Sequence, residues 1–152
     1  MGFQKTIGDK FEKAYEGDVV RGISTHYLTE QAKAEATIKV GGFASQGSKE
    51  GLVKPFGTSD KKVIGVVVKD RLYTSNVETM NVPVGEDLTI LTHGVIAIRS
   101  DKTAVKGQAV WLDDSNGALA FDDSFTTKAS HTFTGFKVVE GCTDNGIILI
   151  EK

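Results

Sequence analysis

The pattern of apolar and polar positions along the chain predicts a series of short β-strands. Residues 36–44 alternate between polar and apolar side chains before a Gly41-Gly42 pair, which indicates a half-buried strand. Residues 63–68 are β-branched except for Gly65, which predicts a strand covered on both faces.

The longest apolar run covers residues 88–99. Counting in twos places four of its side chains on one face: Leu88, Ile90, Ile96 and Ile98. Gly94 interrupts the run, and a lone glycine inside a strand pattern predicts a bulge or a sharp bend.

The last third of the chain has the pattern of two β-hairpins. Residues 109–112 and 118–121 flank a turn that ends in Asn116-Gly117, a pair suited to the positive φ angles of a tight reversal. Residues 133–139 and 147–150 flank a second reversal, at Asn145-Gly146, and further turns are expected at Asp101-Lys102 and Lys106-Gly107. Strands therefore recur every ten to fifteen residues or so, with no long helix between them. This spacing predicts an all-β fold: an antiparallel β-sandwich, jelly-roll-like, or a small barrel.

The first 18 residues differ from the rest. Phe3, Ile7, Phe11 and Tyr15 recur every four residues, a spacing that fits one face of a helix interrupted by Gly8. It also fits an extended arm whose aromatic side chains dock on another surface, and the sequence leaves both possibilities open. The predicted organisation is an N-terminal arm, residues 1–18, followed by a single β domain, residues 19–152.

Composition and charge narrow the possible partners. The 18 Lys and Arg against 20 Asp and Glu give a net charge of −2, so the chain lacks the basic field of a non-specific nucleic-acid binder. No secretory signal or membrane-spanning run is visible, and we expect a soluble chain made in a reducing cytoplasm, with neither nucleic acid nor membrane as a partner. The single cysteine excludes an internal disulfide framework, and 17 glycines against two prolines suit a fold of many tight turns.

Two loops resemble ligand-binding motifs only in part. Residues 42–49 hold the glycines of a phosphate-binding loop, but Ser48 and Lys49 are transposed and no helix follows, so we interpret the segment as a surface loop. Residues 113–116 hold several oxygen ligands, but Ser124 stands where a calcium loop needs a glutamate, so we interpret them as a turn.

The remaining candidates give no catalytic set. His26, His93 and His131 have no metal-like spacing, with His93 expected in a strand and His131 in a loop. Cys142 is interpreted as a small apolar residue at a strand edge, and Trp111 as a core anchor. We therefore predict that the protein is not an enzyme and uses no cofactor or metal.

Several short motifs carry a family resemblance. Residues 1–6 and 14–18 resemble the start of the structural cement, or decoration, proteins of tailed bacteriophages, which often open with Met-Gly-Phe-Gln and enter their first strand through Glu-Gly-Asp. Further resemblances follow in the family's order at residues 42–44, 63–67, 82–85, 92–94, 107–111, 116–117, 134–136 and 146–147. Two departures are Val19-Val20, where the family often has Phe-Ala, and Ser45, where it has Trp.

The resemblance implies a virion protein with a β-sandwich or jelly-roll fold that binds the outer surface of the capsid. Its partners would be neighbouring subunits of the phage major capsid protein and further copies of itself, as a homodimer or homotrimer. Phe3, Phe11 and Tyr15 are the candidate partner-binding residues, because aromatic anchors dominate most protein interfaces. The alternative hypothesis is a ligand-binding, carbohydrate-binding-like β module of a phage or cell-surface protein, with exposed aromatic side chains near Trp111 or Tyr73.

Overall fold

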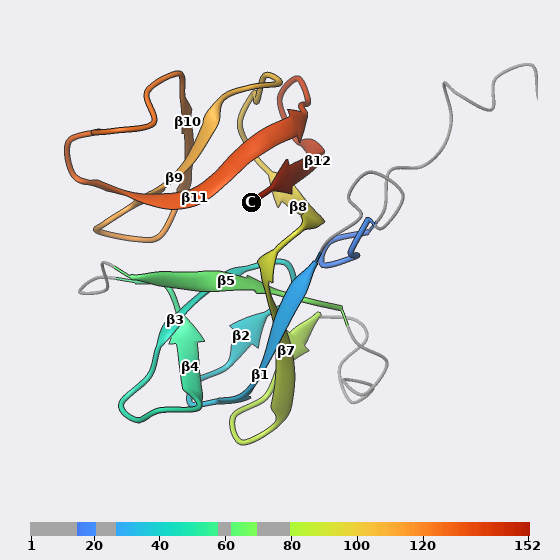
Figure 1. The fold of residues 1–152 in the computed structure, drawn as a ribbon, viewed down its shortest axis with the longest axis vertical. Helices are drawn as coiled ribbons and strands as arrows, with labels where there is room; N and C mark the ends of the chain where they lie inside the picture. The colour runs from blue at the N-terminus through green and yellow to red at the C-terminus, as the bar shows by residue number, and fades with distance from the viewer. Residues whose placement is uncertain (1–14, 21–26, 58–61, 70–79) are drawn as a thin grey trace, which may run out of the picture.

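The computed structural model describes residues 15–20, 27–57, 62–69 and 80–152, and Figure 1 shows how they fold. This part of the chain forms strands and no helix, so it holds no helix that could cross a membrane. The strands are β1 (Leu28–Ala34), β2 (Ile38–Lys39), β3 (Phe43–Gln46), β4 (Leu52–Pro55), β5 (Val63–Val67), β6 (Asn81–Val82), β7 (Asp87–His93), β8 (Val95–Ser100), β9 (Ala109–Asp113), β10 (Leu119–Asp122), β11 (His131–Glu140) and β12 (Gly146–Glu151). The all-β prediction is confirmed.

The first half of the chain forms a small closed barrel with strand order β1-β4-β3-β5-β7 (Figure 1, lower half). Its pairs are antiparallel except β1 with β4, which run parallel through Lys33 opposite Leu52 and Ala34 opposite Val53. The barrel interior is filled by small and β-branched side chains, to which β2 and β6 add Ile38 and Val82.

The second half forms a five-stranded antiparallel sheet with order β10-β9-β11-β12-β8, and it packs against one wall of the barrel. The two halves share the largest apolar cluster among the described residues. The barrel contributes Phe43, Phe56, Val66 and Leu91, and the sheet contributes Ile96, Ile98, Val110, Leu112, Phe136, Val138, Ile148 and Ile150. Within this shared core, the rings of Phe43 and Phe136 meet edge to face, with centroids 5.8 Å apart.

The chain passes from the barrel to the sheet at Gly94, and this confirms the bend predicted there. Gly94 has a φ of +130° and a Cβ there would lie 2.9 Å from the Cβ of Tyr27, so only glycine fits. The bend also corrects the predicted face. Leu88 and Ile90 point into the barrel interior, whereas Ile96 and Ile98 point into the shared core, because the extra residue at the bend ends the simple alternation.

Strand β5 separates the two cores, and this confirms that it is covered on both faces. Val66 belongs to the shared core and Val67 to the barrel interior, and both are fully buried. Gly65 lets β5 approach β7 closely, since a Cβ on Gly65 would lie 2.7 Å from Cγ2 of Ile90 and against the carbonyl oxygen of Leu91.

Both predicted hairpins are present. β9 and β10 flank the turn at residues 113–118, where Gly117 has a φ of +72° and its N–H donates to the carbonyl of Asp113. β11 and β12 also pair, but the left-handed residue of their connection is Asp144, with a φ of +61°, and not the predicted Asn145-Gly146.

Three further local predictions were wrong. The stretch 36–44 is not one strand but contains β2 and the start of β3, because Gly41 and Gly42 turn the chain between them. The segment 42–49, interpreted as a surface loop, contains β3, whose Ala44 and Ser45 are small enough to be buried. His131, expected in a loop, begins β11.

We predict that Gly65→Ala lowers the free energy of unfolding by about 1–3 kcal/mol, because the added methyl group must push β5 away from β7. Urea denaturation measures the loss. Gly146→Ala is the control, since its Cβ would meet nothing nearer than the Cβ of Cys142 at 3.4 Å. Equal losses for the two variants would show that the close approach of β5 and β7 is not the cause.

Candidate partner-binding site

Residues 15–20, here called the root segment, extend the five-stranded sheet along β8. The N–H of Gly17 donates to the carbonyl of Ala97 at 2.8 Å, and the N–H of Ala97 donates to the carbonyl of Asp18 at 3.0 Å. The N–H of Val20 donates to the carbonyl of Val95 at 2.9 Å. The root segment therefore covers the outer edge of β8 as a short additional strand.

The same segment is bonded to the barrel half. The carbonyl of Gly17 accepts a 2.8 Å hydrogen bond from the N–H of Lys69, which follows β5. Gly17 has a φ of +82°, and a Cβ there would lie 2.8 Å from the nitrogen of Lys69. Asp18 closes the turn, because its carboxylate accepts a hydrogen bond from the N–H of Tyr15 at 2.8 Å. The Glu-Gly-Asp motif is thus a turn that needs its glycine and its aspartate.

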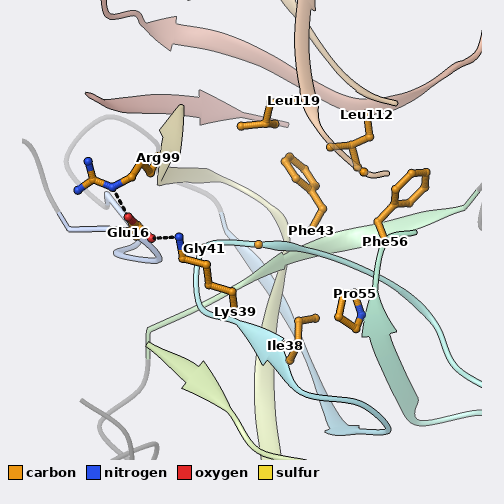
Figure 2. A pocket seen from close by; sticks show the side chains of 12 residues that line it. Glu16, Ile38, Lys39, Gly41, Phe43, Pro55, Phe56, Arg99, Leu112 and Leu119 are labelled. Carbon is orange, nitrogen blue, oxygen red and sulfur yellow. Dashed lines mark hydrogen bonds and ion pairs between the residues drawn. The ribbon is translucent and has the colours of Figure 1, made fainter. Parts of the chain in front are cut away.

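Glu16 joins the two halves through its side chain (Figure 2). Its carboxylate accepts a hydrogen bond from Nε of Arg99 on β8 and pairs with Nζ of Lys39 on β2 at 3.1 Å. The Glu16 side chain is only 13 % exposed, and this burial opposes its ionisation. The hydrogen bonds and charges of Arg99 and Lys39 outweigh burial, so the pKa of Glu16 is lowered below its usual value.

A cleft of about 230 Å³ opens beside this ion pair, at the seam between barrel and sheet (Figure 2). Its mouth is polar, with two cations sharing one carboxylate. Its floor is apolar. The lining residues are Glu16, Ile38, Lys39, Gly41, Gly42, Phe43, Pro55, Phe56, Arg99, Leu112, Gly117 and Leu119. This volume is below the ~300–1,000 Å³ of most small-molecule sites.

Of the predicted partner-binding residues, Tyr15 lies in the root segment and is 64 % exposed. Nζ of Lys69 lies 4.7 Å from the centroid of its ring, a cation–π contact that fixes the ring at the surface. Phe3 and Phe11 lie outside the described residues, as does Ile7, so their role stays a prediction.

Sequence reasoning missed the ionic network of Glu16, Lys39 and Arg99. Arg99 ends an apolar run and Lys39 alternates with apolar neighbours, and both are ordinary on a strand. The one available signal was the Glu-Gly-Asp motif, whose glutamate has no role in the turn itself. Partners 23 and 83 residues from Glu16 are visible only in three dimensions.

The other candidate residues do not converge. His93 ends β7, as predicted, His131 begins β11, and His26 lies outside the described residues. The described residues contain no cluster of three or more metal-ligating side chains. Cys142 is half-buried and packs against the shared core. Residues 113–116 form the predicted turn, in which the N–H of Ser115 donates to the Asp113 carboxylate at 2.8 Å.

Trp111 is a core anchor, as predicted, and only 2 % of it is exposed. Its Nε1 donates to the carbonyl of Ser124 at 3.0 Å, and its ring packs against Phe133 with centroids 5.1 Å apart. Phe125 covers Phe133 and is itself 43 % exposed.

The indole of Trp111 itself is buried and offers no stacking face to a sugar. Trp111 nevertheless lines a hollow together with polar side chains that include Thr126, Lys128 and His131. The ligand-binding alternative therefore stays a prediction at Trp111, while Tyr73 lies outside the described residues.

The fold and the anchored root segment define an all-β structural module. Residues 3–152 match the family described as structural cement protein (E217 gp24/Pam3 gp6). The match spans nearly the whole chain, and the protein therefore belongs to this family of phage structural cement proteins. Its role is structural and associated with the capsid.

Two solved structures share the fold. A chain from the capsid of Myoviridae phage XM1 aligns with a TM-score of 0.69 at 10 % identity, covering 99 % of this chain and 97 % of that chain. The head fibre gp8.5 N base of bacteriophage phi29 aligns with a TM-score of 0.50 at 10 % identity, covering 83 % and 93 %. A search of curated protein sequences gives no match.

We predict that Glu16→Gln lowers the free energy of unfolding by about 1 kcal/mol at neutral pH, a modest loss because Arg99 and Lys39 are half exposed. Since the pKa of Glu16 is lowered in the folded state, ionised Glu16 stabilises the fold fully above its unfolded value of 4.5. This stabilisation is lost as the pH falls through the lower, folded pKa.

Urea denaturation at about pH 7 and about pH 3.5 measures the effect. The difference between the native chain and the variant should shrink at the lower pH. Glu50→Gln, which changes an exposed carboxylate before β4, is the control and should show no such difference. A loss from Glu16→Gln that does not depend on pH would exclude the ionic role.

Proposed function

We propose that this protein binds the outer surface of a tailed-phage capsid and cements neighbouring major capsid protein subunits. In this proposal residues 1–18 act as the partner-binding arm and residues 19–152 as the body. The protein works without catalysis, cofactor or metal, associates with itself as a dimer or trimer, and binds neither nucleic acid nor membrane. It is made in the cytoplasm of the bacterial host and acts on the exterior of the virion.

The observation that carries the proposal is the anchorage of the root segment. A cement must transmit load from the point where it grips its partner into its own body. The root segment bonds to Ala97 of the sheet and to Lys69 of the barrel half, and Glu16 pairs with a cation from each half. A force on the arm is therefore distributed over both halves and does not detach a single edge strand.

Multivalency explains how modest contacts suffice. Each copy adds a small interface between capsid subunits that already touch, so the gain is repeated over the whole shell. The exposed ring of Tyr15, held by Lys69 at the start of the arm, is suited to such an interface because it is rigid and amphipathic.

We predict that Phe3→Ala combined with Phe11→Ala weakens binding to empty capsids by about tenfold to hundredfold, the loss expected when interface hot spots are truncated. Co-sedimentation with capsids measures binding, and circular dichroism checks the fold. Val84→Ala is the control, because Val84 is similarly apolar and 62 % exposed but lies in the turn before β7, at the end of that strand remote from Gly94.

Unimpaired binding of the double variant would exclude the arm as the capsid contact. Deleting residues 1–17 should also weaken capsid binding and leave a folded β domain. Because this deletion removes Glu16 and Gly17, it should lower stability as well, so the double variant is the cleaner test.

A further inference from the structure

Strand β1 extends beyond its pairing with β4, the strand against which it closes the barrel. β7 pairs with β1 from Leu28 to Lys33, whereas β4 pairs only with Lys33 and Ala34. Among the described residues, 28–31 therefore have a neighbouring strand on one side only, and the barrel wall has an open edge along them there.

The hydrogen bonds show which groups line this open edge. The N–H of Lys33 donates to the carbonyl of Gly51 on the β4 side, whereas the N–H of Ala34 donates to the carbonyl of Glu86 on the β7 side. Because backbone groups alternate along a strand, the N–H and C=O groups of Thr29 and Gln31 point to the β4 side. The described residues provide no partner for them there.

Both faces of this stretch are exposed as well. Residues 28–31 are all exposed, and Leu28, at 61 %, is one of the most exposed large apolar side chains among the described residues. A strand docking on this edge would therefore meet free backbone groups between two open faces.

The five-stranded sheet protects its own edges, which makes the open edge of β1 distinctive. The root segment covers β8. On β10, Nζ of Lys102 donates to the carbonyl of Leu119 at 2.8 Å, so a lysine occupies an outward acceptor there. Residues 28–31 have only the charge of Glu30 and a bulge at Leu28-Thr29, and no proline or lysine.

The chain that precedes the root segment is suited to fill the edge. Fourteen residues lie before Tyr15, and an extended chain of that length spans up to about 46–50 Å. In an extended strand Phe3, Ile7 and Phe11 fall on one face, where they can pack on Leu28. In this segment Lys5, Lys10 and Lys13 outnumber Asp9 and Glu12, and the resulting net positive charge complements Glu30.

The root segment also lies at the same end of the molecule as the open edge. Val20 bonds to Val95, and the neighbouring Gly94 lies close to Tyr27, which directly precedes β1. The arm of each copy therefore begins close to residues 28–31 of that copy. When two copies meet at this end, residues 28–31 of each copy lie within reach of the other copy's arm.

We propose that residues 28–31 are the acceptor for the arm of a second copy, residues 1–14, which adds to the barrel as an extra strand. Reciprocal exchange of arms gives a dimer, and one-way exchange closes a ring. The proposal rests on the proposed function in one respect, the use of the arm for partner binding, and it names where that arm docks between copies.

The first test blocks the edge in the full chain. Gln31→Pro removes an outward N–H without removing a bond to β7, and Gln31→Ala loses the same side-chain bond to Thr89 but keeps that N–H. Analytical ultracentrifugation should show that Gln31→Pro weakens self-association by about tenfold or more and that Gln31→Ala does not. A monomeric native chain, or a folded Gln31→Pro variant that associates normally, would overturn the proposal.

The second test holds even if the proline variant fails to fold. Two full-length chains, one with Ile7→Cys and one with Thr29→Cys, both in a Cys142→Ser background, are mixed and treated with a short bis-maleimide. Mass spectrometry should find chains linked between positions 7 and 29. Replacing Thr29→Cys by Val84→Cys, at another exposed site, should abolish the link.

A chain that carries both Ile7→Cys and Thr29→Cys separates the two possible donors of the arm. Links between chains support exchange, whereas links only within one chain would overturn it. Capsid binding by the native chain and by Gln31→Pro, whose arm is unchanged, decides the proposed function separately. The Phe3→Ala and Phe11→Ala variant does not separate the two proposals, because both rings face Leu28 in this one. If Gln31→Pro binds capsids normally but no longer self-associates, this result supports residues 28–31 as a contact between copies and not with the capsid.

Discussion

The barrel and the five-stranded sheet each have an apolar wall that only the other half covers. Phe43, Phe56, Val66 and Leu91 face outward from the barrel, and in a free barrel they would face water. Burying a large apolar side chain is worth about 1.5–3 kcal/mol, so the shared core supplies much of the driving force that joins the halves. The bend at Gly94, the cleft at the seam and the bridging position of Glu16 all depend on this contact.

The root segment joins the two halves by hydrogen bonds and ion pairs, in addition to their apolar contact. Its backbone bonds to the sheet and to Lys69 beyond β5, and the carboxylate of Glu16 holds a cation from each half. In this member of the structural cement family, the root segment is thereby fixed at the seam, where it is bonded to both halves. The root segment supplies an additional strand to β8, whereas residues 28–31 of β1 have only β7 beside them among the described residues.

Local rules predicted what is local in this fold. The turns at Asp101-Lys102 and Asn116-Gly117 and the bend at Gly94 follow from residue chemistry, and so does the all-β class. The faces of Ile96 and Ile98 could not be counted across Gly94, because a bend resets the alternation. The parallel pairing of β1 with β4 and the partners of Glu16 are set by packing between distant segments, and no local pattern encodes them. Only the family motif marked Glu16-Gly17-Asp18 as special, without a reason.

The position of β8 has a consequence for the order of folding. β8 is flanked by the root segment on one side and by β12 on the other. Neither segment can form these pairings before β8 is in place. During synthesis the root segment has no binding site until Val95 and Ala97 have left the ribosome and the bend at Gly94 has formed. Such long-range pairing makes folding slow and cooperative. The root segment is therefore anchored only on a chain whose two halves have already packed together, so an incompletely folded chain would lack this anchorage.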